Sequence, residues 1–202
     1  METKRCFIFG AGDACSLVSA PADGDLVIAA DGGQALCAAL GVEPQLTVGD
    51  FDSSAPPPSG NVVRLPVHKD DTDTLRAVRL GLERGCTEFH IYGGLGGRLG
   101  HTLANLQTLL FLVRRGARGR LYGPHTAVEV IENSAVTLPA AGGVSVFSMG
   151  GTAEGVTITG CEYPLQDAVL TPDFPLGVSN RAVQTPVTIA VRQGALAIVW
   201  EI

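Results

Sequence analysis

The sequence contains no apolar run long enough to span a membrane and no run of basic residues. Its 202 residues carry a formal net charge of −6, which argues against a nucleic-acid-binding surface. Because the overall field repels anions, a polyanionic substrate would need local cations or a bound metal ion. We therefore expect a protein that binds neither a membrane nor nucleic acid.

Other absences narrow the chemistry. The five cysteines include no Cys-x-x-Cys pair, which indicates reduced thiols, a cytoplasmic protein and no zinc site. The first apolar stretch is interrupted at residues 10–13, too early for the core of a signal peptide. Neither a Walker lysine motif nor the glycine-rich loop of protein kinases occurs, so a phosphate site here has to be built differently.

The order of the apolar runs predicts two domains. Short apolar runs alternate with helical patterns up to about residue 120, which is typical of an α/β domain with a mostly parallel sheet. From 121 to 202, Gly, Pro and Thr separate short β-prone runs, which predicts a small antiparallel β-sandwich. The apolar runs of the first part lie at 5–9, 26–30, 45–48, 61–66 and 88–92, and its helical patterns at 34–40, 74–84 and 101–115.

Three local predictions rest on residue patterns. In the helix at 101–115, the apolar spacing predicts a buried stripe of Leu103, Leu106, Leu110 and Val113. Gln193-Gly194 is predicted to join the last two strands as a hairpin. The stretch 175–181 is rich in turn-forming residues and is predicted to be a polar turn.

Two carboxylates follow the apolar run at 45–48, within Gly49-Asp50-Phe51-Asp52-Ser53. Residues two apart in an extended backbone point the same way, so Asp50 and Asp52 can aim at one point. Two hard anionic oxygens suit Mg2+, which prefers carboxylates together with substrate phosphates. The alternative is an acidic turn, since Asp and Ser favour turns.

Two more polar clusters follow predicted strands. Asp31 follows the run at 26–30 and precedes two glycines, where it either faces a ligand or caps the next helix. The other cluster precedes the helix at 74–84, for which Thr72 is the predicted N-cap. It contains more carboxylates than a helix N-terminus needs for a favourable interaction with the helix dipole. This cluster consists of Lys69, Asp70, Asp71, Thr72 and Asp73.

A glycine-rich stretch, Gly93-Gly94-Leu95-Gly96-Gly97-Arg98, lies between a predicted strand and a predicted helix. The backbone N–H groups of such a loop can approach phosphate oxygens, and Arg98 adds a bidentate phosphate partner. We favour a phosphate loop because a plain turn needs fewer glycines. Gly10 and Gly12 form only part of a dinucleotide fingerprint, so a strand followed by a turn is favoured there.

The carboxyl ends of parallel strands share one edge of the sheet, so these clusters should line one crevice. The crevice would then contain several carboxylates, a glycine-rich loop, one Arg and one Lys. These groups are typical of Mg2+-assisted phosphoryl-type transfer. In order and spacing the motifs resemble the thiamine pyrophosphokinase family. The matching stretches are Ala30-Asp31-Gly32-Gly33, residues 49–53, Lys69-Asp70-x-Thr72-Asp73, residues 93–98 and Gly177-Val178-Ser179-Asn180.

The resemblance implies transfer of a diphosphate group from ATP to the hydroxyl of thiamine, giving thiamine diphosphate and AMP. It implies a nucleotide-binding catalytic domain at 1–120 and a thiamine-binding and dimerisation domain at 121–202. It also implies a homodimer, with thiamine bound where the sandwich of one subunit meets the α/β domain of the other.

Residue roles are assigned from this chemistry and from the resemblance. Asp50, Asp52 and Asp73 are expected to hold Mg2+ against the ATP phosphates, and Arg98 to complete the catalytic set. Ser179 and Asn180 are expected to touch thiamine by resemblance alone. The remaining residues expected at the nucleotide site are Asp31, Lys69, Asp70, Thr72, Gly94, Gly96, Gly97 and His101.

Gly100 departs from the family pattern, which reads Arg-x-Asp-His after the glycine loop where this chain has Arg98-Leu99-Gly100-His101. The missing acid is a candidate for contacting the substrate hydroxyl or the metal site. Its loss supports an alternative function, a catalytically weakened or inactive relative that binds thiamine or nucleotide. Asp71 is the first candidate to replace it. A third alternative is an enzyme that phosphorylates a different small alcohol.

Overall fold

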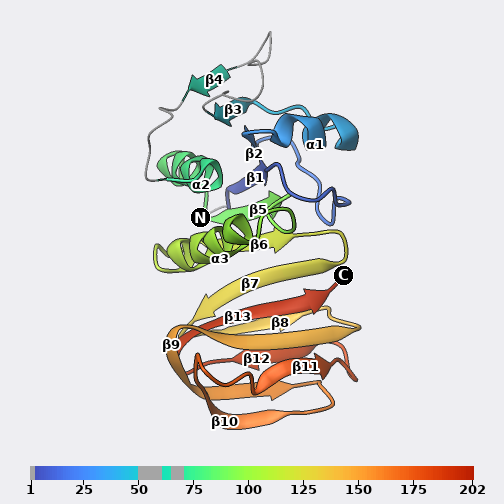
Figure 1. The fold of residues 1–202 in the computed structure, drawn as a ribbon, viewed down its shortest axis with the longest axis vertical. Coiled ribbons are helices and arrows are strands. Elements are labelled where there is room, and N and C mark those ends of the chain that lie inside the picture. Colours follow the sequence, from blue (N-terminus) through green and yellow to red (C-terminus); the bar gives the residue numbers. More distant parts are fainter. Residues whose placement is uncertain (1–2, 50–60, 65–70) are drawn as a thin grey trace. The chain divides into compact units, whose positions relative to one another are not determined.

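The computed structural model describes residues 3–49, 61–64 and 71–202. The chain divides into two compact units, Met1–Pro124 and His125–Ile202 (Figure 1). The predicted boundary at residue 120 falls inside a strand of the first unit, β6 (Arg118–Tyr122). The α/β class predicted from the alternating pattern is confirmed, because in the described part of this unit three helices alternate with strands.

The first unit contains a parallel sheet with the strand order β4-β3-β2-β1-β5-β6. The order reverses after β1, because β2 pairs with one side of β1 and β5 with the other. Open parallel sheets bind ligands at such a point, where the loops after neighbouring strands diverge. The elements are β1 (Arg5–Phe9), β2 (Leu26–Ala30), α1 (Gly33–Leu40), β3 (Leu46–Gly49), β4 (Asn61–Arg64), α2 (Asp73–Glu83), β5 (Glu88–Tyr92), α3 (Leu99–Val113) and β6.

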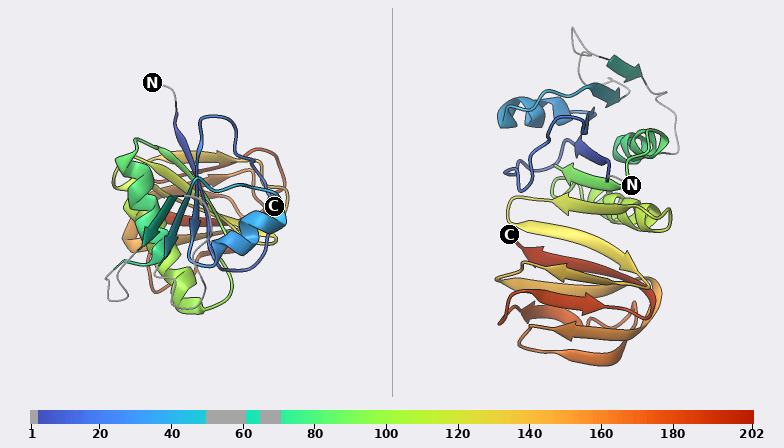
Figure 2. Two further views of the ribbon diagram at one scale, coloured as in Figure 1. Left: turned by 90° about the horizontal axis from the view of Figure 1, so that it is seen from above. Right: turned by 180° about the vertical axis from the view of Figure 1, so that it is seen from behind.

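Helices cover both faces of this sheet (Figure 2). Helix α2 packs against β1, β2 and β3 and contacts α3, which packs on β6. Helix α1 lies on the opposite face, where Gln34 Nε2 donates to Thr47 Oγ1 at 3.2 Å. The predicted N-cap of α2 is confirmed, because Thr72 Oγ1 accepts from the Leu75 N–H at 3.2 Å. This cap fixes where α2 begins, at Asp73.

The buried stripe predicted for the helix at 101–115 is wrong. Helix α3 begins at Leu99, and Leu103 is 54% exposed. The buried positions of α3 are Asn105, Thr108, Leu109 and Leu112. The apolar count selected the wrong face because two polar side chains on the buried face make hydrogen bonds there.

An aromatic stack lies on the sheet between β1, β5 and β6. The ring of His90 stacks on Phe7 at a centroid distance of 4.6 Å, and Tyr92 stacks on Tyr122 at 4.7 Å. His90 Nδ1 lies 3.2 Å from the Tyr122 hydroxyl, and Nε2 lies 3.1 Å from Glu88 Oε1. Burial lowers the pKa of His90, and this outweighs the carboxylate of Glu88, which raises it. His90 is therefore a buried, neutral part of the core.

The second unit is antiparallel and is organised around the long strand β9 (Gly143–Thr159). The first half of β9 pairs with β13 on one side and β11 on the other, and its second half pairs with β12 and β10. Strands β7 and β8 pair with β13 and β12. The remaining bounds are β7 (Thr126–Glu132), β8 (Ala135–Leu138), β10 (Leu165–Leu170), β11 (Gly177–Arg181), β12 (Val187–Ala190) and β13 (Gln193–Glu201).

Two local predictions for this unit are wrong. The last two strands form no hairpin, because β12 pairs with β8 and β9 while β13 pairs with β7 and β9. The predicted polar turn at 175–181 contains β11, an irregular strand that pairs with β9 through Gly177 and Val146. Gly and Asn disfavour strands, so pairing with β9 overrode the local preference.

Among the described residues, no helix combines the length and apolar character needed to cross a membrane. All five cysteines are free and buried.

Candidate functional site

A cavity of about 450 Å³ opens beyond the carboxyl ends of β1, β2 and β5, at the point where the strand order reverses. This volume is in the range of small-molecule sites. Four predicted residues, Asp50, Asp52, Lys69 and Asp70, lie outside the described residues. The predicted residues that line the cavity are Asp31, Thr72, Asp73, Gly94, Gly96, Gly97, Arg98 and His101.

The turn after β1 holds two carbonyls of the glycine loop. The Gly12 N–H donates to the Gly93 oxygen at 2.8 Å, and the Asp13 N–H donates to the Leu95 oxygen at 3.0 Å. A Cβ atom on Gly12 would lie 2.4 Å from the Gly93 oxygen, so this close approach requires glycine. The turn was favoured as a plain connection, but it is part of the site, since Gly10–Gly12 line the cavity.

Helix α3 holds two further carbonyls of the same loop. Asn105 Nδ2 donates to the Gly94 oxygen at 2.7 Å, and Thr102 Oγ1 donates to the Gly96 oxygen at 3.3 Å. Asn105 is 6% exposed and lines the cavity. Sequence reasoning missed it, although its polar side chain among the apolar residues of the helix was a signal.

Four consecutive carbonyls of the loop therefore accept hydrogen bonds from the protein. Within the described part of the chain, the N–H groups of residues 94–97 donate to no other group. Gly96 and Gly97 have positive φ angles of 77° and 60°. Successive N–H groups with no protein acceptor make an anion-binding concavity, so the loop is built to receive phosphate oxygens.

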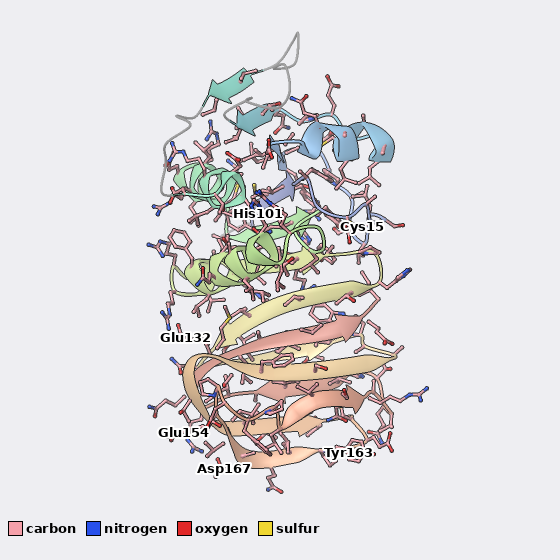
Figure 3. All side chains as sticks on the ribbon, in the orientation of Figure 1. Cys15, His101, Glu132, Glu154, Tyr163 and Asp167 are labelled. Atoms are coloured by element: carbon pink, nitrogen blue, oxygen red, sulfur yellow. The ribbon has the colours of Figure 1, made fainter. Side chains whose placement is uncertain are left out.

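The N-termini of two helices meet the same cavity. Thr72, Asp73 and Thr74 from the start of α2 line it, as do Arg98 and His101 from the start of α3. A helix N-terminus carries a partial positive charge that favours anions. The Arg98 guanidinium contacts His101 Nε2, and Figure 3 shows the His101 side chain at the beginning of α3. This side of the cavity is therefore favourable for a polyanion.

Asp31 lies at the end of β2 in a strained conformation with φ of 52°. Its N–H donates to the Val48 oxygen at 2.7 Å, which ties it to β3. It does not cap α1, because the N-cap is Gly32, with no side-chain cap hydrogen bond. Of the two predicted roles, the structure supports a carboxylate that faces the cavity.

The donor set suits a magnesium ion. Asp31 and Asp73 bring carboxylates to a cavity that also contains the anion-binding loop. Carboxylate oxygens beside substrate phosphates are the ligands that Mg2+ prefers. The described residues contain no group of three or more His, Cys, Asp or Glu side chains arranged to bind a metal.

Asp71 is engaged elsewhere, although it is the first candidate to replace the missing acid at position 100. Its carboxylate lies 2.9 Å from Arg79 Nε, so Asp71, which precedes α2, forms an ion pair with a residue of that helix. Gly100 lies in the first turn of α3, is exposed, and has no atom within 4 Å of a Cβ built on it. Its φ is not positive, so a side chain fits there without strain.

In the second unit, β11 carries the predicted thiamine contacts. Ser179 has φ of 60°, and its N–H donates to Ser145 Oγ at 3.1 Å. Asn180 is 7% exposed, and its side chain makes three hydrogen bonds with backbone. Its Oδ1 accepts from the N–H groups of Tyr163 and Arg181, and its Nδ2 donates to the Tyr163 oxygen. The Asn180 amide is thus occupied by the chain itself.

A second cavity, of about 240 Å³, lies next to β11 and is lined by 146–148 and 170–175. Large apolar side chains are exposed around it: Phe147 is 41% exposed, Phe174 63% and Leu176 45%. Within the described residues, Ser148 Oγ is buried there without a hydrogen-bond partner. Apolar exposure of this kind is typical of an interaction surface.

Comparison with known proteins matches both units to one family. Residues 20–119 match the family model described as thiamin pyrophosphokinase, catalytic domain. Residues 135–196 match the model described as thiamin pyrophosphokinase, vitamin B1 binding domain. A thiamine pyrophosphokinase of Bacillus subtilis (strain 168) is 25% identical over 184 residues, which is 86% of this chain and 86% of that protein.

Solved structures share the fold along nearly the whole chain. The thiamine pyrophosphokinase of Bacillus subtilis superimposes with a TM-score of 0.88 at 24% identity, covering 98% of this chain and 99% of that one. The enzyme from Geobacillus thermodenitrificans gives 0.83 at 23%, covering 98% and 97%. The enzyme from Candida albicans gives 0.79 at 11%, covering 99% and 89%. At these identities, the likeness establishes the fold.

Proposed function

Because the chain belongs to the thiamine pyrophosphokinase family, we propose that it transfers a diphosphate group from ATP to thiamine, with Mg2+ bound. The hydroxyl group of thiamine loses its proton, and its oxygen forms a bond to the β-phosphorus of ATP. The bond from that phosphorus to the bridging oxygen of the α-phosphate breaks, and AMP leaves. The observation that carries this proposal is the glycine loop, whose carbonyls at residues 93–96 accept hydrogen bonds while the N–H groups of residues 94–97 have no protein acceptor among the described residues.

In this proposal the chain's residues bind and orient the phosphates. The N–H groups of the glycine loop and the start of α3 receive phosphate oxygens. Arg98 stabilises the charge that develops on the transferred group, and His101 holds the guanidinium from one helical turn further on. Thr72 fixes the start of α2, which places Asp73 at the cavity. Lys69 and Asp70 would support this side.

Asp31 and Asp73, together with Asp50 and Asp52, would hold Mg2+. When bound, the ion neutralises phosphate charge and orients the polyphosphate. We place the protein in the cytoplasm, which is consistent with five free cysteines.

The test is product analysis with thiamine and Mg-ATP. We expect thiamine diphosphate and AMP in equal amounts, with neither formed when thiamine or Mg2+ is omitted. Release of ADP would indicate a single-phosphate transfer. AMP formation that does not depend on thiamine, but does depend on another small alcohol, would indicate the third candidate function.

One observation favours a second function. Gly100 leaves open space where the family pattern places an acid, and Asp71 is paired with Arg79. A relative that binds Mg-ATP and thiamine but turns them over weakly or not at all would fit this arrangement. Calorimetric binding of both compounds, with no AMP released over hours, would support that function and contradict the first.

We further propose a homodimer in which thiamine binds between the second unit of one subunit and the first unit of its partner. Support comes from exposed apolar residues on both units: Phe147 and Phe174 on the second, Leu99 and Leu103 on the first. At 72% and 54% exposure, the two leucines form an apolar ridge at the start of α3. Ser179 would contact thiamine directly, and Asn180 would fix the backbone that presents it.

Light scattering tests the dimer. We expect twice the mass of one chain, and dissociation at low micromolar concentration for Phe174→Ser, with Val18→Ser as a control at another exposed apolar residue. A wild-type monomer that turns over thiamine normally would contradict the shared pocket.

A further inference from the structure

Helix α3 carries two side chains that grip the glycine loop. Asn105 and Thr102 are one turn apart on α3, and each donates to a loop carbonyl, of Gly94 and Gly96 respectively. The neighbouring carbonyls, of Gly93 and Leu95, are held by backbone N–H groups of the turn after β1. Two separate elements therefore hold the loop, and the donors that α3 supplies are side chains that can be changed by mutation.

Asn105 occupies a position that packing alone would give to an apolar residue. It is 6% exposed, while Leu99 and Leu103 on the same helix face solvent. Burying an amide costs free energy unless it is hydrogen-bonded, and the Gly94 oxygen supplies the partner. Thr108, one turn further on, is also buried, but its hydroxyl bonds back to the Ala104 oxygen of its own helix. Asn105 thus connects the helix to the loop, whereas Thr108 does not.

A carbonyl that turned toward the phosphates would place a negative dipole where the loop must offer N–H groups. The hydrogen bond from Asn105 at 2.7 Å prevents this at residue 94, where the chain leaves the positive-φ turn at Gly93. We propose that Asn105, assisted by Thr102, is a positioning residue for polyphosphate binding. It keeps the Gly94 carbonyl out of the anion site, so that the following N–H groups are presented to the phosphates. This inference rests on the proposed function for the identity of its ligand, ATP.

The test compares Asn105→Leu and the isosteric Asn105→Asp with Thr108→Val. Calorimetry without thiamine measures the dissociation constant for Mg-ATP, and steady-state assays give KM for each substrate. We expect both Asn105 variants to weaken Mg-ATP binding by about 10- to 100-fold, the range for losing a residue that supports a ligand-binding group. KM for thiamine should stay near the wild-type value, and Thr108→Val should bind Mg-ATP normally.

The aspartate variant adds a readout that a purely structural role would not give. Its carboxylate can donate to the Gly94 oxygen only when protonated, so its Mg-ATP affinity should recover partly toward pH 5 relative to wild type. If Asn105→Leu fails to fold, Asn105→Asp and Thr102→Val carry the same comparison. Thr102→Val removes the weaker, exposed bond and should have the smaller effect.

Unchanged Mg-ATP affinity in folded Asn105 variants would overturn the inference, as would an equal loss in Thr108→Val. Wild-type protein that binds Mg-ATP but makes no thiamine diphosphate, with affinity lost in the Asn105 variants, would support the inference and contradict the proposed reaction. Wild-type protein that does not bind Mg-ATP would overturn both.

Discussion

The glycine loop of the first unit and strand β11 of the second are each held by a buried asparagine, and the two asparagines differ in what they leave free. Asn105 binds one carbonyl and lines a cavity. Asn180 uses both ends of its amide on backbone groups of Tyr163 and Arg181. The exposures, 6% and 7%, are almost equal. Burial alone therefore does not distinguish an asparagine that shapes a binding loop from one that completes a sheet edge.

The backbone groups beside the two asparagines also differ. In the glycine loop, four backbone N–H groups have no acceptor within the described residues, which is the condition for binding an anion. In β11, the strained Ser179 is held by Ser145, and apolar side chains are exposed nearby. We infer that changes at the glycine loop act on activity and changes at Asn180 act mainly on folding.

The largest expected effect is a loss of activity that follows a change at the glycine loop but not a change on β11. Arg98→Gln should lower kcat/KM by about 100-fold or more, because it removes a charge-stabilising group, and should leave the unfolding midpoint unchanged since Arg98 is exposed. Arg181→Gln, on β11, is the matched control and should remain near wild type in both measurements. Near-normal turnover in Arg98→Gln would remove the phosphate role from this loop.

The second prediction tests the folding role of Asn180. Asn180→Ala leaves three backbone groups without a partner and should lower the free energy of unfolding by about 1–3 kcal/mol. The single tryptophan, Trp200, lies buried in β13 of the same unit, so urea denaturation followed by its fluorescence reports this loss. Thr137→Ala, at an exposed hydrogen bond in the same unit, should cost less than about 0.5 kcal/mol. Comparable losses in the two variants would contradict the role given to Asn180.

The third prediction concerns His90, which is buried in the first unit. Its contribution to folding can be measured from the pH dependence of the free energy of unfolding. Burial lowers the pKa of His90 below its ordinary 6.5, so the unfolded chain takes up the proton first. The stabilisation is present above pH 6.5 and is lost as the pH falls below 6.5 toward the lower pKa of the folded state. His90→Phe keeps the stacking on Phe7 and should flatten the stability profile between about pH 5 and 7. Urea denaturation at several pH values in this range measures the free energy of unfolding, and His125→Gln, at an exposed histidine, is the control. Parallel profiles for wild type and His90→Phe would show that other groups cause the pH dependence.

The smallest expected change is at the rim of the glycine loop. Gly100→Asp should fold and gain about 0.3–1 kcal/mol, because an acid in the first turn of α3 favours the helix dipole and meets no atom. We expect it to release AMP faster than Gly100→Ala, which gains helix propensity without a carboxylate. Equal turnover in the two variants would show that another group already supplies what the acid would.

The α/β class and the Thr72 cap could be predicted from the sequence because both depend on local patterns. The sequence also predicted that Asp31, Asp73, Arg98 and His101 lie at one cavity, because the carboxyl ends of parallel strands share one edge of the sheet. Prediction from the sequence failed where the structure of a segment depends on the elements that it pairs with or packs against. Strand β11 forms from poor strand residues, β12 and β13 do not pair with each other, and α3 buries Asn105 in place of Leu103. Each outcome depends on a neighbour distant in sequence, which periodicity does not record.

The backbone hydrogen bonds between the turn after β1 and the glycine loop, here called the backbone clip, affect how fast amide hydrogens exchange with solvent. The N–H groups of Gly10, Gly12 and Asp13 donate to Tyr92, Gly93 and Leu95, although Gly12 is only half-buried and Asp13 is exposed. These amides should therefore exchange with deuterium as slowly as those of the sheet, while the amides of residues 94–97 exchange quickly until a ligand covers them. The clip also couples the lengths of two loops that lie far apart in the sequence. An insertion in one would open both, so this pair should tolerate substitutions better than changes in length.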